Sequence, residues 1–262
     1  MSDCYSDRNF DDLAEKFSRK VYGGLKGDIR LAVIRRDMQA AIASIAGERS
    51  LRILDVGGGL GQHSVELAQL GHRVVYSDIS SVMCDAARAR ARDQQVEDQI
   101  QWHCASYQHL SELIDQKFDL VMCHALIEWL AKPELLIRKL RAWIDCNGWL
   151  SLTFYNRNGL DYRNLIRGNF HALERQFSVD RGSLTPQHPL TPDEVLVWFE
   201  HAGLSLCASS GIRVFHDYVT TLRGGHADPS SILKMELKYS TKEPFKWLGR
   251  YVHLIGQPTP PN

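Results

Sequence analysis

The chain has 262 residues, with 31 Lys or Arg and 31 Asp or Glu, so its formal net charge is zero. Hydrophobic residues make up 44% of it, enough for a sizeable core, and the balanced charge excludes a strongly basic nucleic-acid binder and a highly charged disordered chain. The six cysteines are dispersed without a C-x-x-C pair, and the start MSDCYSDRNFDD is polar and acidic; we therefore expect a cytoplasmic protein with no disulfide framework, signal peptide or membrane span.

Two helices are predicted at the N-terminus, over residues 11–22 and 28–46, from the spacing of their apolar residues. The segment GGLKG joins them. We expect residues 1–50 to form an N-terminal helical cap and residues 51–262 to form a second, α/β domain.

Short apolar runs alternate with amphipathic stretches between residues 51 and 154. The runs are LRILDV, HRVVYSD, IQWHC, FDLVMCH and WLSLTFY, and the intervening helices are predicted at 62–70, 80–92, 108–113 and 133–144. Strands rich in Val, Ile and Leu that alternate with helices favour a parallel, doubly wound sheet covered on both faces. Ligands of such sheets bind at the carboxyl ends of the strands.

Residues 156–190 interrupt this alternation and are predicted to be irregular, as an insert that forms either a functional lid or a disordered segment. Thr191 and Pro192 then favour the start of a helix that ends near His201. Two further strands are predicted at 204–219 and 248–257, with a helix near 230–238 between them.

The segment RILDVGGGLGQHS carries the pattern D-x-G-x-G-x-G, with Asp55, Gly57, Gly59 and Gly61. It lacks the dinucleotide fingerprint G-x-G-x-x-G, because Gln62 stands where the third glycine belongs, and it lacks the Lys-Ser/Thr of a P-loop. A ligand without phosphates therefore fits better, and S-adenosylmethionine is such a ligand. Asp55 is placed to help meet its cationic end.

Asp78 ends the strand VVYSD. An acid at this position accepts hydrogen bonds from the hydroxyls of an adenosine ribose, in NAD as well as in the methyl donor. The alternative is a structural role at the start of the helix that follows Ser80.

These features, with DIS and LSLTFYN, resemble the class I methyltransferases. DRNFDDLAEKFSRKVYG, GGGLGQ, HALIEWL, RGNF, RVFHDY and LGRYVH further resemble the bacterial tRNA 5-carboxymethoxyuridine methyltransferases, over roughly residues 7–256. The resemblance implies a Rossmann-like, seven-stranded, mostly parallel sheet with N-terminal helices and an insert after the fifth strand. It also implies S-adenosylmethionine as donor and, as acceptor, the carboxylate of 5-carboxymethoxyuridine at the wobble position of the tRNA anticodon loop.

The donor residues of the family carry over onto matching positions. Arg30 is expected to pair with the methionine carboxylate, and His124 to lie beside the methionyl chain. Ser106 and Tyr107 are expected near the adenine, where Gln108 replaces the acid that many class I enzymes have. The expected donor site is Arg30, Asp55, Gly57, Gly58, Asp78, Ser106, Tyr107 and His124. An exposed basic helix face, shared with Arg35 and Arg36, is the alternative for Arg30; a polar strand end is that for His124. Glu128 and Trp129 are expected to be helix packing.

A carboxylate acceptor is ionised at neutral pH, so methyl transfer to it needs alignment and exclusion of water and no general base. We therefore expect no catalytic acid–base residue and no metal. The acceptor site must hold an anion, and Arg with aromatic residues suits that task. The candidates are Tyr155, Arg213, His216, Tyr218 and Arg250. The alternative for IRVFHDYV is an ordinary strand with alternating faces.

Three other functions stay open at this point. The first is a methyltransferase for a small-molecule carboxylate or a quinone-type precursor. The second is a donor-binding or tRNA-binding module without activity, and the third is a dehydrogenase.

Overall fold

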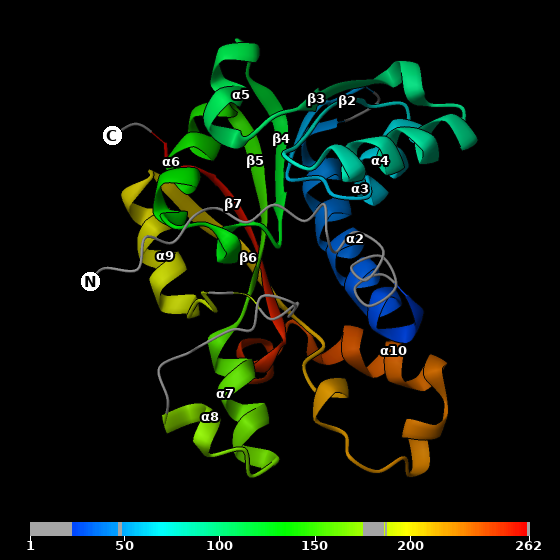
Figure 1. Ribbon diagram of the computed structural model, residues 1–262, viewed down its shortest axis with the longest axis vertical. Helices are drawn as coiled ribbons and strands as arrows, with labels where there is room; N and C mark the ends of the chain where they lie inside the picture. The colour runs from blue at the N-terminus through cyan, green and yellow to red at the C-terminus, as the bar shows by residue number, and fades with distance from the viewer. Residues whose placement is uncertain (1–22, 47–48, 175–185, 187, 261–262) are drawn as a thin grey trace.

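The computed structural model describes residues 23–46, 49–174, 186 and 188–260, and the helix predicted at 11–22 lies outside them. A seven-stranded sheet with the order β3-β2-β1-β4-β5-β7-β6 runs through the molecule (Figure 1). β7 is antiparallel to both neighbours and the other pairs are parallel, which confirms the predicted mostly parallel sheet. The strands are β1 (Arg52–Val56), β2 (Arg73–Asp78), β3 (Ile100–Cys104), β4 (Phe118–His124), β5 (Ile144–Tyr155), β6 (Leu204–Ile212) and β7 (Tyr251–Pro258).

Helices cover both faces of the sheet (Figure 1). One apolar layer joins the sheet to α2, α3 and α4, and the other joins it to α5, α6 and α9. The strand β4 is buried over six of its seven residues, as expected for a central strand of a sheet covered on both sides. The helices are α2 (Gly24–Ala46), α3 (Gln62–Gln69), α4 (Ser81–Asp93), α5 (Tyr107–Leu113), α6 (Pro133–Trp143), α7 (Arg157–Ile166), α8 (His171–Glu174), α9 (Pro192–His201) and α10 (Pro229–Tyr239).

The helix starts follow the local chemistry read from the sequence. Ser80 caps α4 by accepting a hydrogen bond from the Met83 N–H. Thr191 and Glu194 form a reciprocal capping box at the start of α9, with Pro192 in the first turn. Both predicted helices are confirmed.

Residues 156–190 are more ordered than predicted at their N-terminal end. The expectation of an irregular segment is wrong for α7 and α8, because the Asn156 side chain accepts from the Asn158 N–H and caps α7 directly after β5. α7 and α8 lie at the same end of the molecule as α10 (Figure 1).

The strand predicted over 204–219 is wrong beyond Ile212. Arg213 adopts φ +60°, a left-handed conformation that ends the strand, and His216–Tyr218 form a 3-10 turn. The carboxylate of Glu236, on α10, accepts the backbone N–H groups of Val214, Phe215 and His216 at 2.7–3.1 Å. A buried acid thus replaces the lost sheet partners and turns RVFHDY out of the sheet.

Helix α2 packs on β5, β6, β7 and α10. The division of the chain into a cap over residues 1–50 and a domain over 51–262 stays a prediction.

Candidate functional site

The glycine loop is fastened to the end of the neighbouring strand β2. The N–H groups of Gly57 and Gly58 both donate to the Ser77 carbonyl, at 2.8 and 3.0 Å. Gly57 has φ +71°, and a Cβ there would lie 2.8 Å from a methyl carbon of Leu126. A Cβ on Gly58 would lie 2.5 Å from the ring of Tyr76. Both positions require glycine, which keeps the loop flat against the sheet and leaves room above it.

Asp78 ties three parts of the site together. Its Oδ2 accepts from the Gly59 N–H and its Oδ1 from the Ser80 N–H, both at 2.9 Å. The carboxylate therefore holds the glycine loop and the start of α4 while its side chain lines the adjacent pocket. The structural role and the proposed ribose contact are compatible, because a carboxylate has about four lone-pair sites.

A pocket lies at the carboxyl ends of β1, β2 and β4, where ligands of doubly wound sheets bind. It brings together Gly57, Asp78, Ser106, Tyr107 and His124, five of the eight residues expected at the donor site. The exposed Gln108 also lines it. Sequence reasoning missed its apolar wall, which consists of Val56, Ile79, Met83, Ala125, Leu126, Trp129 and Leu130.

Trp129 was expected to be packing only, yet it lines this pocket. It sits in a 3-10 turn, Ile127–Trp129, after β4. The signal available in the sequence was its distance of five residues from His124, at the tip of a strand that already faced the donor. An apolar wall beside a polar floor suits the adenine and ribose of adenosylmethionine.

Asp55 and Gly58 lie beneath the loop and outside the pocket lining. Asp55 is buried at the carboxyl end of β1, where the Ser64 hydroxyl donates to its Oδ2 at 2.6 Å. Burial raises the pKa of Asp55 to about 7, an effect that Asp78 reinforces and Ser64 opposes. An effect of Asp55 on the donor would therefore act as a charge through the loop.

Arg30, on α2, is also outside the pocket lining and is only 5% exposed, so the alternative of an exposed basic face is wrong for this residue. Its guanidinium lies 3.9 Å from the centre of the Tyr251 ring. It acts electrostatically on His124, Glu128 and Arg213. Arg30 thus lies between the donor pocket and a second group of polar residues.

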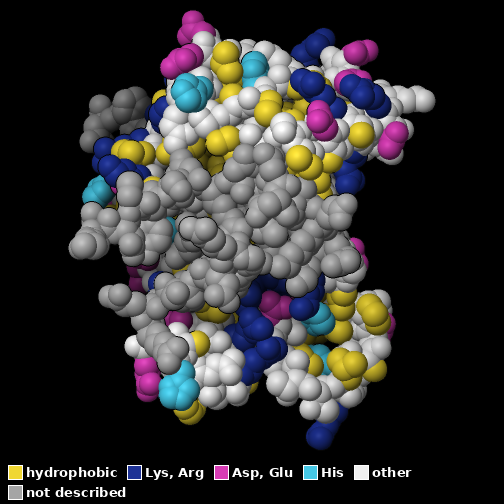
Figure 2. Space-filling view, in the orientation of Figure 1, with side chains coloured by type: hydrophobic (Ala, Val, Ile, Leu, Met, Phe, Trp, Pro, Cys, Tyr) yellow, Lys and Arg dark blue, Asp and Glu magenta, His cyan; other side chains and the backbone are white. Residues whose placement is uncertain are grey.

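That second group is a basic cluster around Asp217. We define it as Lys26, Arg163, Arg213 and Arg250. The distances from the Asp217 carboxylate are 3.6 Å to Arg213, 3.8 Å to Lys26 and 4.0 Å to Arg250. Figure 2 shows Lys and Arg side chains gathered in a hollow between the lobe of α7 and α8 and that of α10.

The positive charge of the basic cluster exceeds the single acid at its centre. Burial opposes ionisation of Asp217, but Arg213, Arg250 and Lys26 outweigh it and lower its pKa. Burial lowers the pKa of Arg213, although Asp217 opposes this. Glu128 adds little negative charge nearby, because burial raises its pKa to about 8.

Sheet pairing sets the basic cluster beside the donor pocket. His124 pairs with Thr153 of β5, Tyr155 pairs with Tyr251 of β7, and Tyr251 also pairs with Ile212 of β6. Arg213 directly follows Ile212 and Arg250 directly precedes Tyr251. Both arginines therefore lie beside the carboxyl ends of β5 and β6. The Arg250 guanidinium stacks 4.6 Å from the Tyr155 ring centre, and the Tyr155 hydroxyl has no partner among the described residues.

The other two acceptor candidates lie on the same turn but differ in availability. Tyr218 donates its hydroxyl to the carbonyls of Gly159 and Leu248, which gives it a role in holding α7. His216 is partly buried, and its Nδ1 has no partner among the described residues. Tyr155, Arg213, Arg250 and His216 are therefore the candidates with polar atoms that remain open to an acceptor, whereas the Tyr218 hydroxyl is engaged.

No helix among the described residues is long and apolar enough to cross a bilayer. No group of three His, Cys, Asp or Glu side chains in the same part of the chain is arranged to hold a metal ion.

Comparisons with known proteins point to methyltransferases. Residues 54–152 match the methyltransferase-domain family. The tRNA 5-carboxymethoxyuridine methyltransferase of Escherichia coli O157:H7 is 38% identical over 253 residues, which cover 96% of each chain. A ubiquinone biosynthesis O-methyltransferase of Coxiella burnetii (strain RSA 331 / Henzerling II) is 31% identical over 161 residues, 62% of this chain and 66% of the relative.

Solved structures agree on the fold. Magnesium protoporphyrin IX methyltransferase (ChlM) from Synechocystis PCC 6803 with bound SAH has a TM-score of 0.62 at 18% identity, covering 94% of this chain and 95% of that one. The same enzyme with bound SAM has a TM-score of 0.58 at 17% identity. This chain therefore belongs to the tRNA 5-carboxymethoxyuridine methyltransferase family of class I methyltransferases, and its cofactor is S-adenosylmethionine.

Proposed function

We propose that the protein methylates the carboxylate of 5-carboxymethoxyuridine at the wobble position of tRNA and so forms the methyl ester. The observation that carries this proposal is the basic cluster beside the donor pocket, in a chain that resembles the Escherichia coli enzyme over 96% of its length. In this proposal the pocket binds the methyl donor and the basic cluster binds the anionic acceptor.

The donor end of the site needs only to bind and to exclude water. S-adenosylmethionine supplies an activated methyl group that an ionised carboxylate attacks directly. Gly57, Asp78 and the pair Ser106 and Tyr107 are proposed to hold the adenosine half. The apolar side chains of Leu126 and Trp129 keep bulk water from that half of the pocket. Alignment of this kind accounts for up to ~7–11 kcal/mol of a barrier.

The acceptor end needs an anion-binding site, and the basic cluster has the required surplus of charge. The side chains of Arg213 and Arg250 are 13% and 15% exposed, and each has a buried N–H group without a partner among the described residues. A carboxylate placed between them would satisfy these donors and the Tyr155 hydroxyl in a region of low dielectric constant, where charged hydrogen bonds are strong. The surrounding hollow suits the phosphates of an anticodon loop.

The runner-up is a quinone-type precursor, which the Coxiella burnetii relative favours by its name. A phenol of ordinary pKa, near 10, would need a general base to ionise. The acceptor side is dominated by cationic guanidiniums, which stabilise an anion and accept no proton, and His216 is the one candidate there that could act as a base. The geometry therefore favours the carboxylate.

The test compares arginine variants of the full-length protein on tRNA from cells that lack it. In Arg213→Met and Arg250→Met, kcat/KM for labelled methyl transfer to tRNA should fall roughly 10- to 100-fold while the affinity for S-adenosylhomocysteine stays within about twofold. Arg73→Met is the matched control, because Arg73 is exposed at the amino end of β2, away from the carboxyl ends of the strands. Unchanged transfer in both cluster variants would refute the acceptor assignment.

A further inference from the structure

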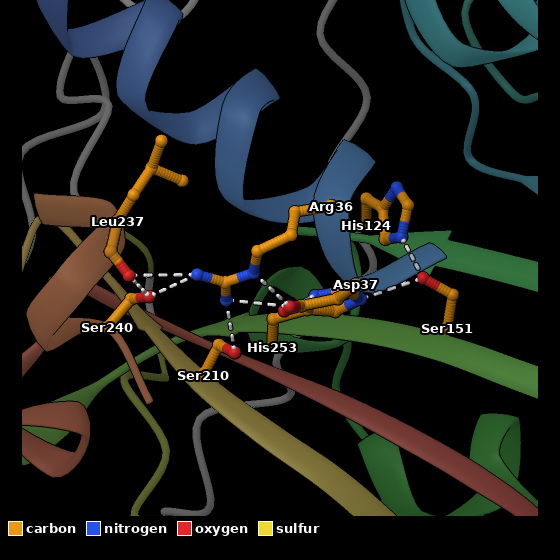
Figure 3. A network of polar contacts seen from close by, with 8 residues as sticks. All are labelled: Arg36, Asp37, His124, Ser151, Ser210, Leu237, Ser240 and His253. Atoms are coloured by element: carbon orange, nitrogen blue, oxygen red, sulfur yellow. Dashed lines mark hydrogen bonds and ion pairs between the residues drawn. The ribbon is translucent and has the colours of Figure 1, made fainter. Parts of the chain in front are cut away.

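Two buried side chains, Ser151 and His253, and two half-buried ones, Asp37 and His124, form a continuous chain of hydrogen bonds that ends at the donor pocket (Figure 3). The Asp37 carboxylate on α2 lies 2.9 Å from Nδ1 of His253, on β7. Nε2 of His253 lies 2.8 Å from the Ser151 hydroxyl, on β5, and the same hydroxyl lies 2.8 Å from Nε2 of His124. The chain spans four elements, α2, β7, β5 and β4, from widely separated parts of the sequence, so no single motif shows it.

The proton positions along this chain follow from what each group can donate. Burial opposes ionisation of Asp37, yet the hydrogen bond from His253 and the charge of Arg36 lower its pKa, so it is an ionised acceptor. His253 must therefore carry its proton on Nδ1. When His253 is neutral, its Nε2 accepts the single Ser151 proton. Ser151 can then only accept from His124, whose own proton must sit on Nε2.

Arg36 balances the charge of Asp37. Its guanidinium pairs with Asp37 at 2.6 Å and supplies the positive charge that balances this carboxylate. It is fixed there by Ser210, Ser240 and the Leu237 carbonyl (Figure 3). A second positive charge on His253 would leave the buried group with an excess.

His124 itself is held neutral by its surroundings. Burial, with His63, His253 and Arg30 nearby, lowers the pKa of His124 well below its ordinary value. His63 on α3 faces it with ring centres 5.2 Å apart and is also neutral, since burial lowers its pKa to about 3. No acid is among these neighbours. A neutral imidazole with its proton on Nε2 has a lone pair on Nδ1, the nitrogen turned away from Ser151 (Figure 3).

We propose that Asp37, His253 and Ser151 are positioning residues that lock His124 as its Nε2–H tautomer, so that Nδ1 presents a lone pair to the ammonium group of the donor's methionyl chain. The ring of His124 lines the donor pocket, which makes this contact available. This inference concerns the donor site alone. It would hold even if the protein did not methylate tRNA, and the experiments that test it use no tRNA.

The decisive variant is Asp37→Asn, because it should reverse the chain. Arg36 donates to one side of this side chain, so the asparagine oxygen must face Arg36 and its NH2 group must face His253. His253 then carries its proton on Nε2 and donates to Ser151, which donates to His124. The proton of His124 consequently moves to Nδ1, and an N–H group faces the donor's ammonium group.

Two readouts follow this reversal. Long-range 1H–15N correlation spectra of the full-length protein should show the His124 proton on Nε2 in the wild type and on Nδ1 in Asp37→Asn. The affinity for S-adenosylhomocysteine should fall roughly 10- to 100-fold in the variant. The affinity for 5′-methylthioadenosine, which lacks the ammonium group, should stay within about twofold. A purely structural defect would weaken both ligands alike.

A matched pair of serine variants keeps the test open if Asp37→Asn fails to fold. Ser151→Ala breaks the chain and should weaken S-adenosylhomocysteine several-fold. Ser240→Ala removes an equally buried hydroxyl that contacts Arg36 and the Leu237 carbonyl, and should leave this affinity unchanged. The proposal is overturned if wild-type His124 carries its proton on Nδ1, if Asp37→Asn weakens both ligands equally, or if the two serine variants behave alike.

Discussion

Replacement of Asp55 by asparagine should stabilise the folded protein, although Asp55 is the first residue of the glycine-loop motif D-x-G-x-G-x-G. Asp55 is fully buried beneath the glycine loop, and burial raises the pKa of its carboxyl from 3.8 to about 7. The folded state therefore binds a proton more tightly than the unfolded chain does. The folded state therefore loses stability as pH rises from about 4 to about 7. Above that range Asp55 is ionised in both states, and the full cost of its buried charge applies.

The size of the effect follows from the same two values. A pKa raised from 3.8 to about 7 corresponds to about 4 kcal/mol at ~1.4 kcal/mol per pH unit. At pH 5 only about 2 kcal/mol of this cost is present. Asparagine carries no charge, and its carbonyl oxygen can still accept the hydrogen bond from Ser64. Asp55→Asn should thus be more stable than the wild type by up to about 4 kcal/mol at pH 8 and by about half of that at pH 5.

Urea unfolding followed by tryptophan fluorescence at pH 5 and pH 8 measures both values. Asp85→Asn, an exposed acid on α4, is the control and should change the free energy of unfolding little at either pH. Because the donor is cationic, Asp55→Asn should also weaken S-adenosylmethionine while it stabilises the free protein. A variant that is less stable than the wild type at pH 8, or a difference that is equal at both pH values, would refute the reasoning.

Three further substitutions test the frame of the site. Gly58→Ala places a Cβ 2.5 Å from the Tyr76 ring and should cost about 1–3 kcal/mol in thermal unfolding, whereas Gly225→Ala, which meets open space, should not. Glu236→Gln replaces an acceptor of three backbone N–H groups and should cost about 1–3 kcal/mol, with a parallel loss of methyl transfer to tRNA and no loss of donor affinity. Asp78→Asn should weaken S-adenosylhomocysteine roughly 10- to 100-fold by calorimetry, and an unchanged affinity would contradict the ribose contact.

The strands, their order of appearance and the donor loop could be predicted because their signals are local. The run RILDV followed by glycines, and Ser80 or Thr191 before a helix, each act within a few residues. The end of β6 at Ile212 could not be predicted, because Glu236 from another element takes the backbone hydrogen bonds of the next three residues.

The candidate site shows the same limit. Arg213 and Arg250 were expected near the acceptor as separate arginines, but their shared partner Asp217 emerges only when β6 and β7 pair. His124 could be placed at the tip of its strand. Its connection to Asp37 required the pairing of β5 with β7 and the packing of α2 on both.

The central claim is tested most directly by nucleoside mass spectrometry of tRNA. tRNA from cells that lack the protein is incubated with it and with S-adenosylmethionine that carries a labelled methyl group, and is then digested to nucleosides. We predict that 5-carboxymethoxyuridine is converted to its labelled methyl ester and that mild alkali removes the label, as it does from an ester. Label that is absent from tRNA, or that resists alkali because it sits on a base nitrogen or ribose oxygen, would contradict the account.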